Sequence, residues 1–209
     1  EHPELACTLI DVEDGPHMAE AIMRELCAAD EEREIAWRAQ QRFVARLVKV
    51  SEPADQVPQL RWDGTVLITG GLGALGLHVA RWLAQGGMKH LMLTGCRGQD
   101  TPGAAEAIAE LEALGAQVTV AAIDVSDGAA MQGLLETIKP DLPLRGVIHA
   151  AGLLDDGVLS KQNSDRFAQV MSPKVMGASH LDALTRDADL DFFVLYSSIS
   201  GSLGSGGQG

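Results

Sequence analysis

The chain has 209 residues, of which 46% are hydrophobic, so it can form one α/β domain of ordinary size with a smaller appendage. Its net charge of −13 argues against nucleic acid and anionic membrane surfaces as partners. There is no long apolar run, no C-x-x-C pair among the three cysteines and no metal-binding spacing among the six histidines. These features favour a cytoplasmic protein with reduced thiols, no membrane span and no metal site.

Residues 1–58 predict a small α/β unit. Apolar spacing indicates strands at residues 8–12, 35–37 and 42–50 and a helix at residues 18–27. The charge cluster at residues 30–34 is interpreted as a solvated loop, and residues 52–59, with two prolines, as a linker. We expect a structural partner here, because no catalytic constellation is present.

Residues 59–209 alternate strands and helices, which predicts a Rossmann-type, doubly wound parallel sheet. The expected strands are residues 66–68, 90–93, 118–123, 146–149 and 191–198. The expected helices are residues 102–114, 128–138 and 166–184, together with one that carries Leu75, Val79 and Leu83 after the first strand. Pro173 lies inside the last helix, where we expect a kink.

The turn after the first strand carries glycines at G-x-G-x-x-G spacing, Gly71, Gly73 and Gly76. Such glycines permit a tight turn and close approach of the backbone to a pyrophosphate at the helix N-terminus. The alternative is a glycine-rich turn that only packs a helix on a strand. Because the context is strand, turn and helix, the dinucleotide interpretation is favoured.

Ligands of such sheets bind at the carboxyl ends of the strands. We therefore expect cofactor contacts from Thr69, Gly70, Gly71, Leu72, Gly73, Ala74, Leu75, Gly76, Cys96, Arg97, Asp124, Val125, Ala150, Ala151, Gly152, Lys174 and Ser197. Arg97 follows the second strand about 20 residues after Gly76, where an arginine accommodates the 2′-phosphate of NADP. No acidic residue lies between Leu93 and Gly98, which favours NADPH; an exposed surface arginine is the alternative.

Three further rim residues each have two interpretations. Asp124 could accept a hydrogen bond from adenine, or cap a helix. Ser198 could donate to a substrate carbonyl, or satisfy loop backbone. Lys174, in a mostly apolar helix, could be a semi-buried ammonium that favours a neighbouring phenolate, or a solvated helix lysine.

From Glu1 to Gly209 the sequence resembles the ketoreductase domains of modular type I polyketide synthases, within the short-chain dehydrogenase/reductase superfamily. The matching segments include EHPEL, RFVARL, DGTVLITGGLGALG, LRGVIHAAGLLDDGVL, PKVMGASHL and FFVLYSSISGSLGSGGQG. The resemblance implies that residues 1–58 are the C-terminal part of a structural subdomain plus a linker. Residues 59–209 would be the NADPH-binding catalytic subdomain, truncated before the catalytic tyrosine.

The resemblance assigns Lys174 and Ser198 as catalytic, whereas the family's tyrosine would follow Gly209 and is not Tyr196. It implies hydride transfer from NADPH to a β-ketoacyl thioester on the phosphopantetheine of an acyl carrier protein domain, with other domains of the synthase as partners. The 209 residues alone are expected to be inactive.

Leu154, Asp155 and Asp156 match the family's LDD signature of B-type reductases, which set the D configuration; a polar loop is the alternative. Leu203 stands where A-type members carry tryptophan. Cys96 departs from the family pattern, which has an arginine there, and puts the NADPH preference in question. Two alternatives therefore stay open: a degenerate, non-reducing scaffold or epimerase, and an unrelated reductase of a free small molecule.

Overall fold

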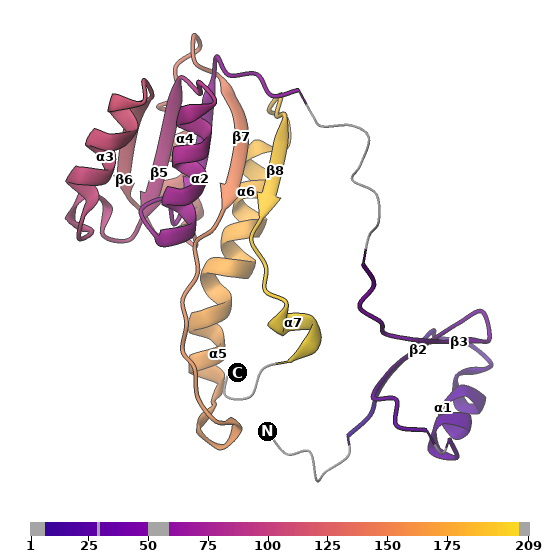
Figure 1. Ribbon diagram of the computed structural model, residues 1–209. Helices are drawn as coiled ribbons and strands as arrows, with labels where there is room; N and C mark the ends of the chain where they lie inside the picture. The colour runs from indigo at the N-terminus through magenta and orange to yellow at the C-terminus, as the bar shows by residue number, and fades with distance from the viewer. Residues whose placement is uncertain (1–6, 29, 50–58, 205–209) are drawn as a thin grey trace. The chain divides into compact units, whose positions relative to one another are not determined.

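The computed structural model describes residues 7–28, 30–49 and 59–204. The chain divides into two compact units, Glu1–Gln56 and Val57–Gly209, each with a sheet of its own (Figure 1). No helix in the described ranges is long and apolar enough to cross a membrane.

The first unit is a three-stranded sheet with one helix. Its elements are β1 (Leu9–Val12), α1 (Met18–Leu26), β2 (Glu34–Arg38) and β3 (Gln41–Val44), with β1 parallel and β3 antiparallel to β2. Ala21, Ile35 and Trp37 form its buried core. The strand predicted over residues 42–50 is too long: β3 ends at Val44, which pairs with Ile35 near the start of β2, so only Glu34 of β2 remains for a longer β3 to pair with.

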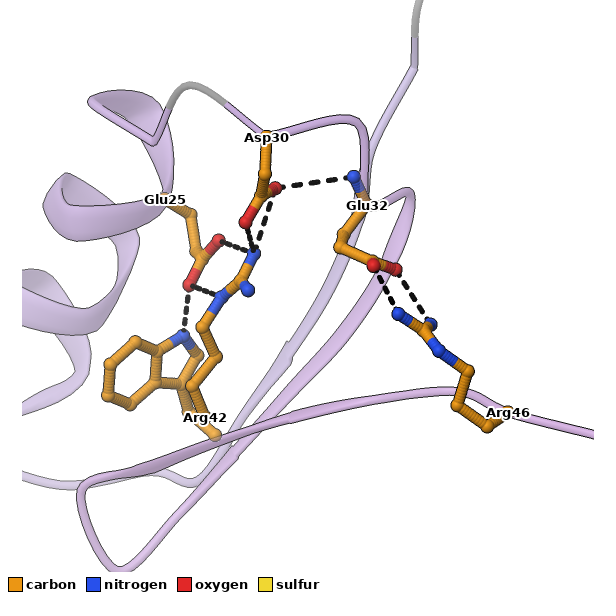
Figure 2. Close-up of polar contacts among 6 residues, drawn as sticks. Glu25, Asp30, Glu32, Arg42 and Arg46 are labelled. Carbon is orange, nitrogen blue, oxygen red and sulfur yellow. Dashed lines mark hydrogen bonds and ion pairs between the residues drawn. The ribbon is translucent and has the colours of Figure 1, made fainter. Parts of the chain in front are cut away.

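The acidic cluster of the first unit is a largely exposed loop, as predicted, and two of its acids also form ion pairs that the prediction did not include. Asp30 forms an ion pair with Arg42 at 2.9 Å, and Glu32 forms one with Arg46 (Figure 2). Arg46 lowers the pKa of the Glu32 carboxyl. Two of the predicted loop acids therefore fasten the loop to the sheet.

The second unit is a five-stranded parallel sheet in the order β6-β5-β4-β7-β8, which confirms the predicted fold class. Its strands are β4 (Thr65–Thr69), β5 (His90–Gly95), β6 (Gln117–Ala122), β7 (Leu144–His149) and β8 (Phe192–Leu195). The connecting α-helices are α2 (Ala74–Gln85), α3 (Ala104–Ala113), α4 (Gly128–Leu135), α5 (Ser164–Met171) and α6 (Gly177–Thr185), followed after β8 by α7 (Ser200–Leu203). Short 3₁₀ turns lie at η2 (Gly98–Asp100) and η3 (Leu159–Lys161).

The central strand β4 is buried on both faces, as its apolar run predicts. Val66 and Ile68 pack with α2 and α3 on one face, whereas Leu67 packs with α4 and α6 on the other (Figure 1). Leu75, in the first turn of α2, is exposed and does not join the core stripe predicted for that helix. The sheet thus holds the ends of β4, β5, β6 and β7 along one rim.

The helix predicted over residues 166–184 begins at Ser164 and is interrupted at Pro173. A π-helical turn, η4 (Ser172–Met176), separates α5 from α6, and the Gly177 N–H donates to the Ser172 carbonyl across it. Pro173 has no N–H to donate, which explains why the regular helix breaks here. The predicted kink is therefore a π turn, a feature frequent at functional sites.

The last strand, β8, is shorter than the predicted residues 191–198. Leu195 pairs with His149, the final residue of β7, and the Tyr196 N–H donates to the His149 carbonyl. Beyond that point β7 offers no further backbone partner. Ser197 and Ser198 therefore follow the strand instead of ending it.

Candidate functional site

The glycine turn after β4 is packed so closely that Gly71 and Gly76 have no room for a Cβ atom. A Cβ on Gly76 would lie 2.3 Å from the Gly70 carbonyl oxygen, and one on Gly71 would lie 2.8 Å from the Ile68 oxygen. Gly70 itself has φ +64°, a conformation that glycine adopts without strain. Backbone bonds from Gly71 to Thr94 and from Gly73 to Gly70 close the turn.

This turn fits the pyrophosphate of a dinucleotide. Gly73 is the N-cap of α2 and supplies no capping side chain, and the first turn of α2 carries no acidic residue. The first N–H groups of a helix have no acceptor within it, and the helix dipole favours an anion there. Ala74 and Leu75 lie in that first turn, and Leu72 packs on the core beside it. The predicted loop therefore has the free donors and the space that a phosphate requires.

A pocket of about 450 Å³ opens beside the turn, at the carboxyl ends of β5, β6 and β7. It brings together six of the predicted residues, namely Gly70, Cys96, Asp124, Val125, Ala151 and Gly152. It also includes Thr94, Leu153, Gln169, Ser172 and Pro173, which were not predicted. Thr94 is the residue before the last one of β5, so a rule that selects residues after the strand ends does not include it.

Thr94 gives an independent indication of a ligand. Its Oγ1 is buried and has no hydrogen-bond partner in the described part of the chain, although the residue lines the pocket. A buried hydroxyl without a partner is costly unless a ligand or water satisfies it. The Thr94 hydroxyl is therefore an unsatisfied polar group in the wall of the pocket.

Of two charged residues predicted at the rim, Asp124 lines the pocket and Arg97 does not. Asp124 lines the pocket, and its Oδ1 accepts bonds from the Ser126 N–H at 2.9 Å and hydroxyl at 2.7 Å. The alternative that Asp124 caps α4 is wrong, because Asp127 is the N-cap of that helix. Arg97 is exposed and does not line the pocket, and its side chain makes no hydrogen bond or ion pair with other described residues.

Lys174 lies in the π turn and is exposed, so the prediction of a semi-buried ammonium is wrong. Its aliphatic stem still reaches the pocket margin: a Cβ on Gly152 would lie 3.4 Å from Lys174 Cε. The π turn thus carries Lys174 toward the loop after β7.

Ser197 and Ser198 are both exposed and do not line the pocket. The Ser198 Oγ accepts a bond from the Ser200 N–H at 3.1 Å, which is the loop-backbone role given as its alternative. The hydroxyl proton of Ser198 is left free to donate.

His149, which sequence reasoning did not select, links the turn, the pocket loop and the π turn. Its ring is buried, and Nδ1 lies 2.6 Å from Thr69 Oγ1, which in turn accepts from the Ala151 N–H at 3.3 Å. Ala150 extends the same connection through a bond from its N–H to the Thr69 carbonyl. Burial lowers the pKa of His149, and the carbonyls of Pro173 and Lys174 act weakly in the opposite direction.

The segment Leu154–Asp156 lies in the loop between β7 and α5. Leu154 and Asp156 are exposed, whereas Asp155 is half-buried and bonded to Arg166, which lowers the pKa of its carboxyl. The side chain of Asp156 makes no hydrogen bond or ion pair within the described ranges. The two aspartates of the signature therefore differ in what they can do.

Comparison with known proteins agrees with this geometry. A family model described as "KR domain" matches residues 64–209. The chain is 48% identical over 178 residues to the polyketide synthase GfsB of Streptomyces halstedii, covering 85% of this chain and 3% of that protein. It is 42% identical over 213 residues to the pikromycin synthase component PikAIII of Streptomyces venezuelae, covering 100% and 14%.

A solved structure of "A-type Ketoreductases from Modular Polyketide Synthase" superposes with a TM-score of 0.91 and 40% identity, covering 100% of this chain and 45% of that one. The chain thus spans a small part of the curated relatives that it matches and under half of that solved chain. The family model covers most of this chain and the resemblance in sequence and fold runs through the rest. The chain therefore belongs to the KR domain family, the ketoreductase domains of modular polyketide synthases.

Proposed function

We propose that this domain reduces the β-keto group of a β-ketoacyl thioester to a β-hydroxyacyl thioester with NADPH, within a cytoplasmic polyketide synthase. The acyl chain would be carried on the phosphopantetheine of an acyl carrier protein domain. The observation that carries the proposal is the closed glycine turn at the start of α2, which opens directly into the pocket at the strand ends. Residues 59–209 would form the catalytic subdomain and residues 1–58 the end of a structural one.

The backbone of the glycine turn would hold the pyrophosphate, and Asp124 and Cys96 would line the adenosine side of the pocket. When bound, NADPH supplies a hydride to the β-carbonyl carbon. The Ser198 hydroxyl, whose oxygen already accepts from the Ser200 N–H, would donate a hydrogen bond to the carbonyl oxygen and orient it, while the proton itself comes from a tyrosine. Lys174 would stabilise a phenolate and so lower the pKa of a tyrosine proton donor.

That tyrosine is assigned from the family resemblance to the segment after Gly209. Tyr196, the one tyrosine in the sequence, is unsuited, because it directly follows β8 and its N–H bonds to His149. The 209 residues alone are therefore expected not to turn over, whereas the full-length protein is expected to.

We assign the D configuration to the product, on the strength of Leu154, Asp155 and Asp156. The A-type neighbour shares the fold, and configuration depends on a loop that the fold does not determine. Chiral analysis of the 3-hydroxyacyl product tests the assignment, and an L product would overturn it.

A non-reducing scaffold or epimerase is the second candidate, and one observation favours it. Cys96 lines the pocket where the family carries an arginine, while Arg97 does not line it. The full-length protein, a β-ketoacyl pantetheine thioester and NADPH separate the two. Loss of NADPH absorbance with formation of a hydroxyacyl product supports reduction; exchange of the α-hydrogen alone supports epimerisation.

A further inference from the structure

Arg166, in the first turn of α5, holds the loop that joins β7 to α5 at several points. Its Nε donates to Asp155 Oδ2 at 2.6 Å and its Nη2 to Asp155 Oδ1 at 2.5 Å. Nη2 also donates to the backbone carbonyls of Asp155 and Asp156, each at 3.1 Å, and Nη1 to the Lys161 carbonyl at 3.0 Å. A planar guanidinium can make this set of bonds, whereas an ammonium cannot.

The loop is shaped to receive this side chain. A Cβ on Gly157 would lie 2.9 Å from Arg166 Nη1 and 3.1 Å from Nη2, so the guanidinium occupies the space that a side chain there would need. Gln162 donates to the Gly157 carbonyl at 3.3 Å, and Asn163 caps α5 by accepting from the Arg166 N–H at 3.0 Å. Both ends of the loop are thus arranged around the side chain of Arg166.

The same loop and helix form one side of the pocket. Leu153 stands at the start of the loop and Gln169 lies one turn after Arg166 on α5, and both line the pocket. Figure 1 shows the chain after β7 running alongside α5 before it turns into that helix. Fixing the loop on α5 therefore fixes the relation between these two lining residues.

We propose that Arg166 is a positioning residue that sets the configuration of the product by anchoring Asp155. Asp155 is then an anchor, and Leu154 and Asp156 are the exposed members of the signature, which the anchor holds in place. The inference rests on the proposed reduction. The inference gives Asp155 and Asp156 different roles, whereas the sequence pattern alone treats the two aspartates alike.

The first test measures the anchor itself, without catalysis. Hydrogen exchange of the amides of residues 154–162 is compared in the wild type, Arg166→Gln and Asp155→Asn. We expect exchange to quicken about tenfold or more in both variants, because the loop loses its bonds to α5. Arg186→Gln is the matched control, since Arg186 forms an exposed i,i+4 pair with Asp182 on α6, away from the loop. Unchanged exchange in Arg166→Gln would overturn the anchor.

The second test measures the ratio of the two hydroxyacyl enantiomers made by the full-length protein. Arg166→Gln and Asp155→Asn should lower this ratio about tenfold while NADPH affinity stays within about twofold, because differential positioning changes and cofactor contacts do not. Arg166→Lys should rescue only part of the ratio, and Arg186→Gln should match the wild type. A mobile loop with an unchanged ratio would refute the positioning role. If the wild type reduces nothing, the proposed function is contradicted, and the exchange comparison still decides whether Arg166 anchors the loop.

Discussion

Thr69 Oγ1 lies 2.6 Å from His149 Nδ1, and this contact joins the strand that enters the glycine turn to the strand that enters the pocket loop. Thr69 Oγ1 also accepts from the Ala151 N–H at 3.3 Å, so the same hydroxyl contacts both the end of β7 and the loop that follows it. Nε2 is buried and has no regular hydrogen bond in the described ranges, although the Pro173 and Lys174 carbonyls favour its protonation. The neutral ring thus faces the π turn that carries Lys174.

We expect the stability of the second unit to fall as the pH drops below the ordinary histidine pKa. Burial lowers the pKa of His149 and of His90, so the unfolded chain takes up protons more readily than the folded one. The contribution of the two neutral histidines to stability is fully present above about pH 6.5. As the pH falls toward their pKa values in the folded protein, this contribution is lost at up to about 1.4 kcal/mol per pH unit for each histidine.

Urea unfolding measured on both sides of that pH, in the wild type and in His149→Gln, checks this dependence. The variant should lose less stability on acidification, since one of the two protons is no longer taken up on unfolding. His78→Gln, at an exposed position of α2, should keep the wild-type slope. If the free energy of unfolding falls equally with pH in the wild type and in His149→Gln, then His149 does not contribute to the pH dependence.

The glycine turn makes a sharp prediction about coenzyme binding. In Gly76→Ala the new methyl group must displace the Gly70 carbonyl, which lies 2.3 Å from the Cβ position. We expect NADPH to bind at least about tenfold more weakly, even though alanine is the better helix former by about 1 kcal/mol. Gly133→Ala is the matched control, because Gly133 lies within α4, outside the pocket lining, and its Cβ would meet nothing within 4 Å. Fluorescence titration of NADPH measures both, and equal affinities would show that the turn does not hold the coenzyme.

Cys96 offers a test of coenzyme preference. It lines the pocket after β5, so Cys96→Arg would bring a guanidinium to the place where the family binds the 2′-phosphate. We expect NADPH affinity to rise about tenfold and NADH affinity to stay unchanged, because a charge-assisted bond forms with the phosphate alone. Cys27→Arg, at an exposed cysteine of the first unit, should alter neither dissociation constant. If the affinity for NADH rises equally, the new arginine does not act on the 2′-phosphate, which NADH lacks.

The parts of the fold that the sequence predicts are those determined by local pattern. The apolar run of β4, the glycine spacing and the helix after it are adjacent in the chain, so periodicity and turn chemistry suffice. The pocket residues Cys96, Asp124 and Gly152 follow from the rule on strand ends, because a parallel sheet brings those ends together.

Features that depend on contacts between distant segments were not predicted. Residues 30–34 form the exposed loop that was predicted, but its ion pairs with Arg42 and Arg46 arise only once β3 pairs with β2. The link from Thr69 to His149 joins residues 80 positions apart, and a histidine gives no periodic signal of its role. Pro173 indicates a break in the helix, but it does not indicate that the break takes the form of a π turn.

The last prediction concerns Glu25, at the end of α1, which joins three elements of the first unit (Figure 2). Its nearly buried carboxylate accepts from Trp37 Nε1 at 2.7 Å and from Arg42 Nε at 2.9 Å and Nη2 at 3.0 Å. The bond from Arg42 lowers the pKa of the Glu25 carboxyl, which therefore remains ionised near neutral pH.

In Glu25→Ala the indole N–H loses its acceptor, so we expect the first unit to lose about 1–3 kcal/mol of stability. Hydrogen exchange of the β2 and β3 amides measures the loss. Glu20→Ala, on the same helix, removes exposed pairs with Arg24 and His17 and should cost at most about 0.5 kcal/mol. Equal effects of the two substitutions would show that the buried network contributes no more than a surface ion pair.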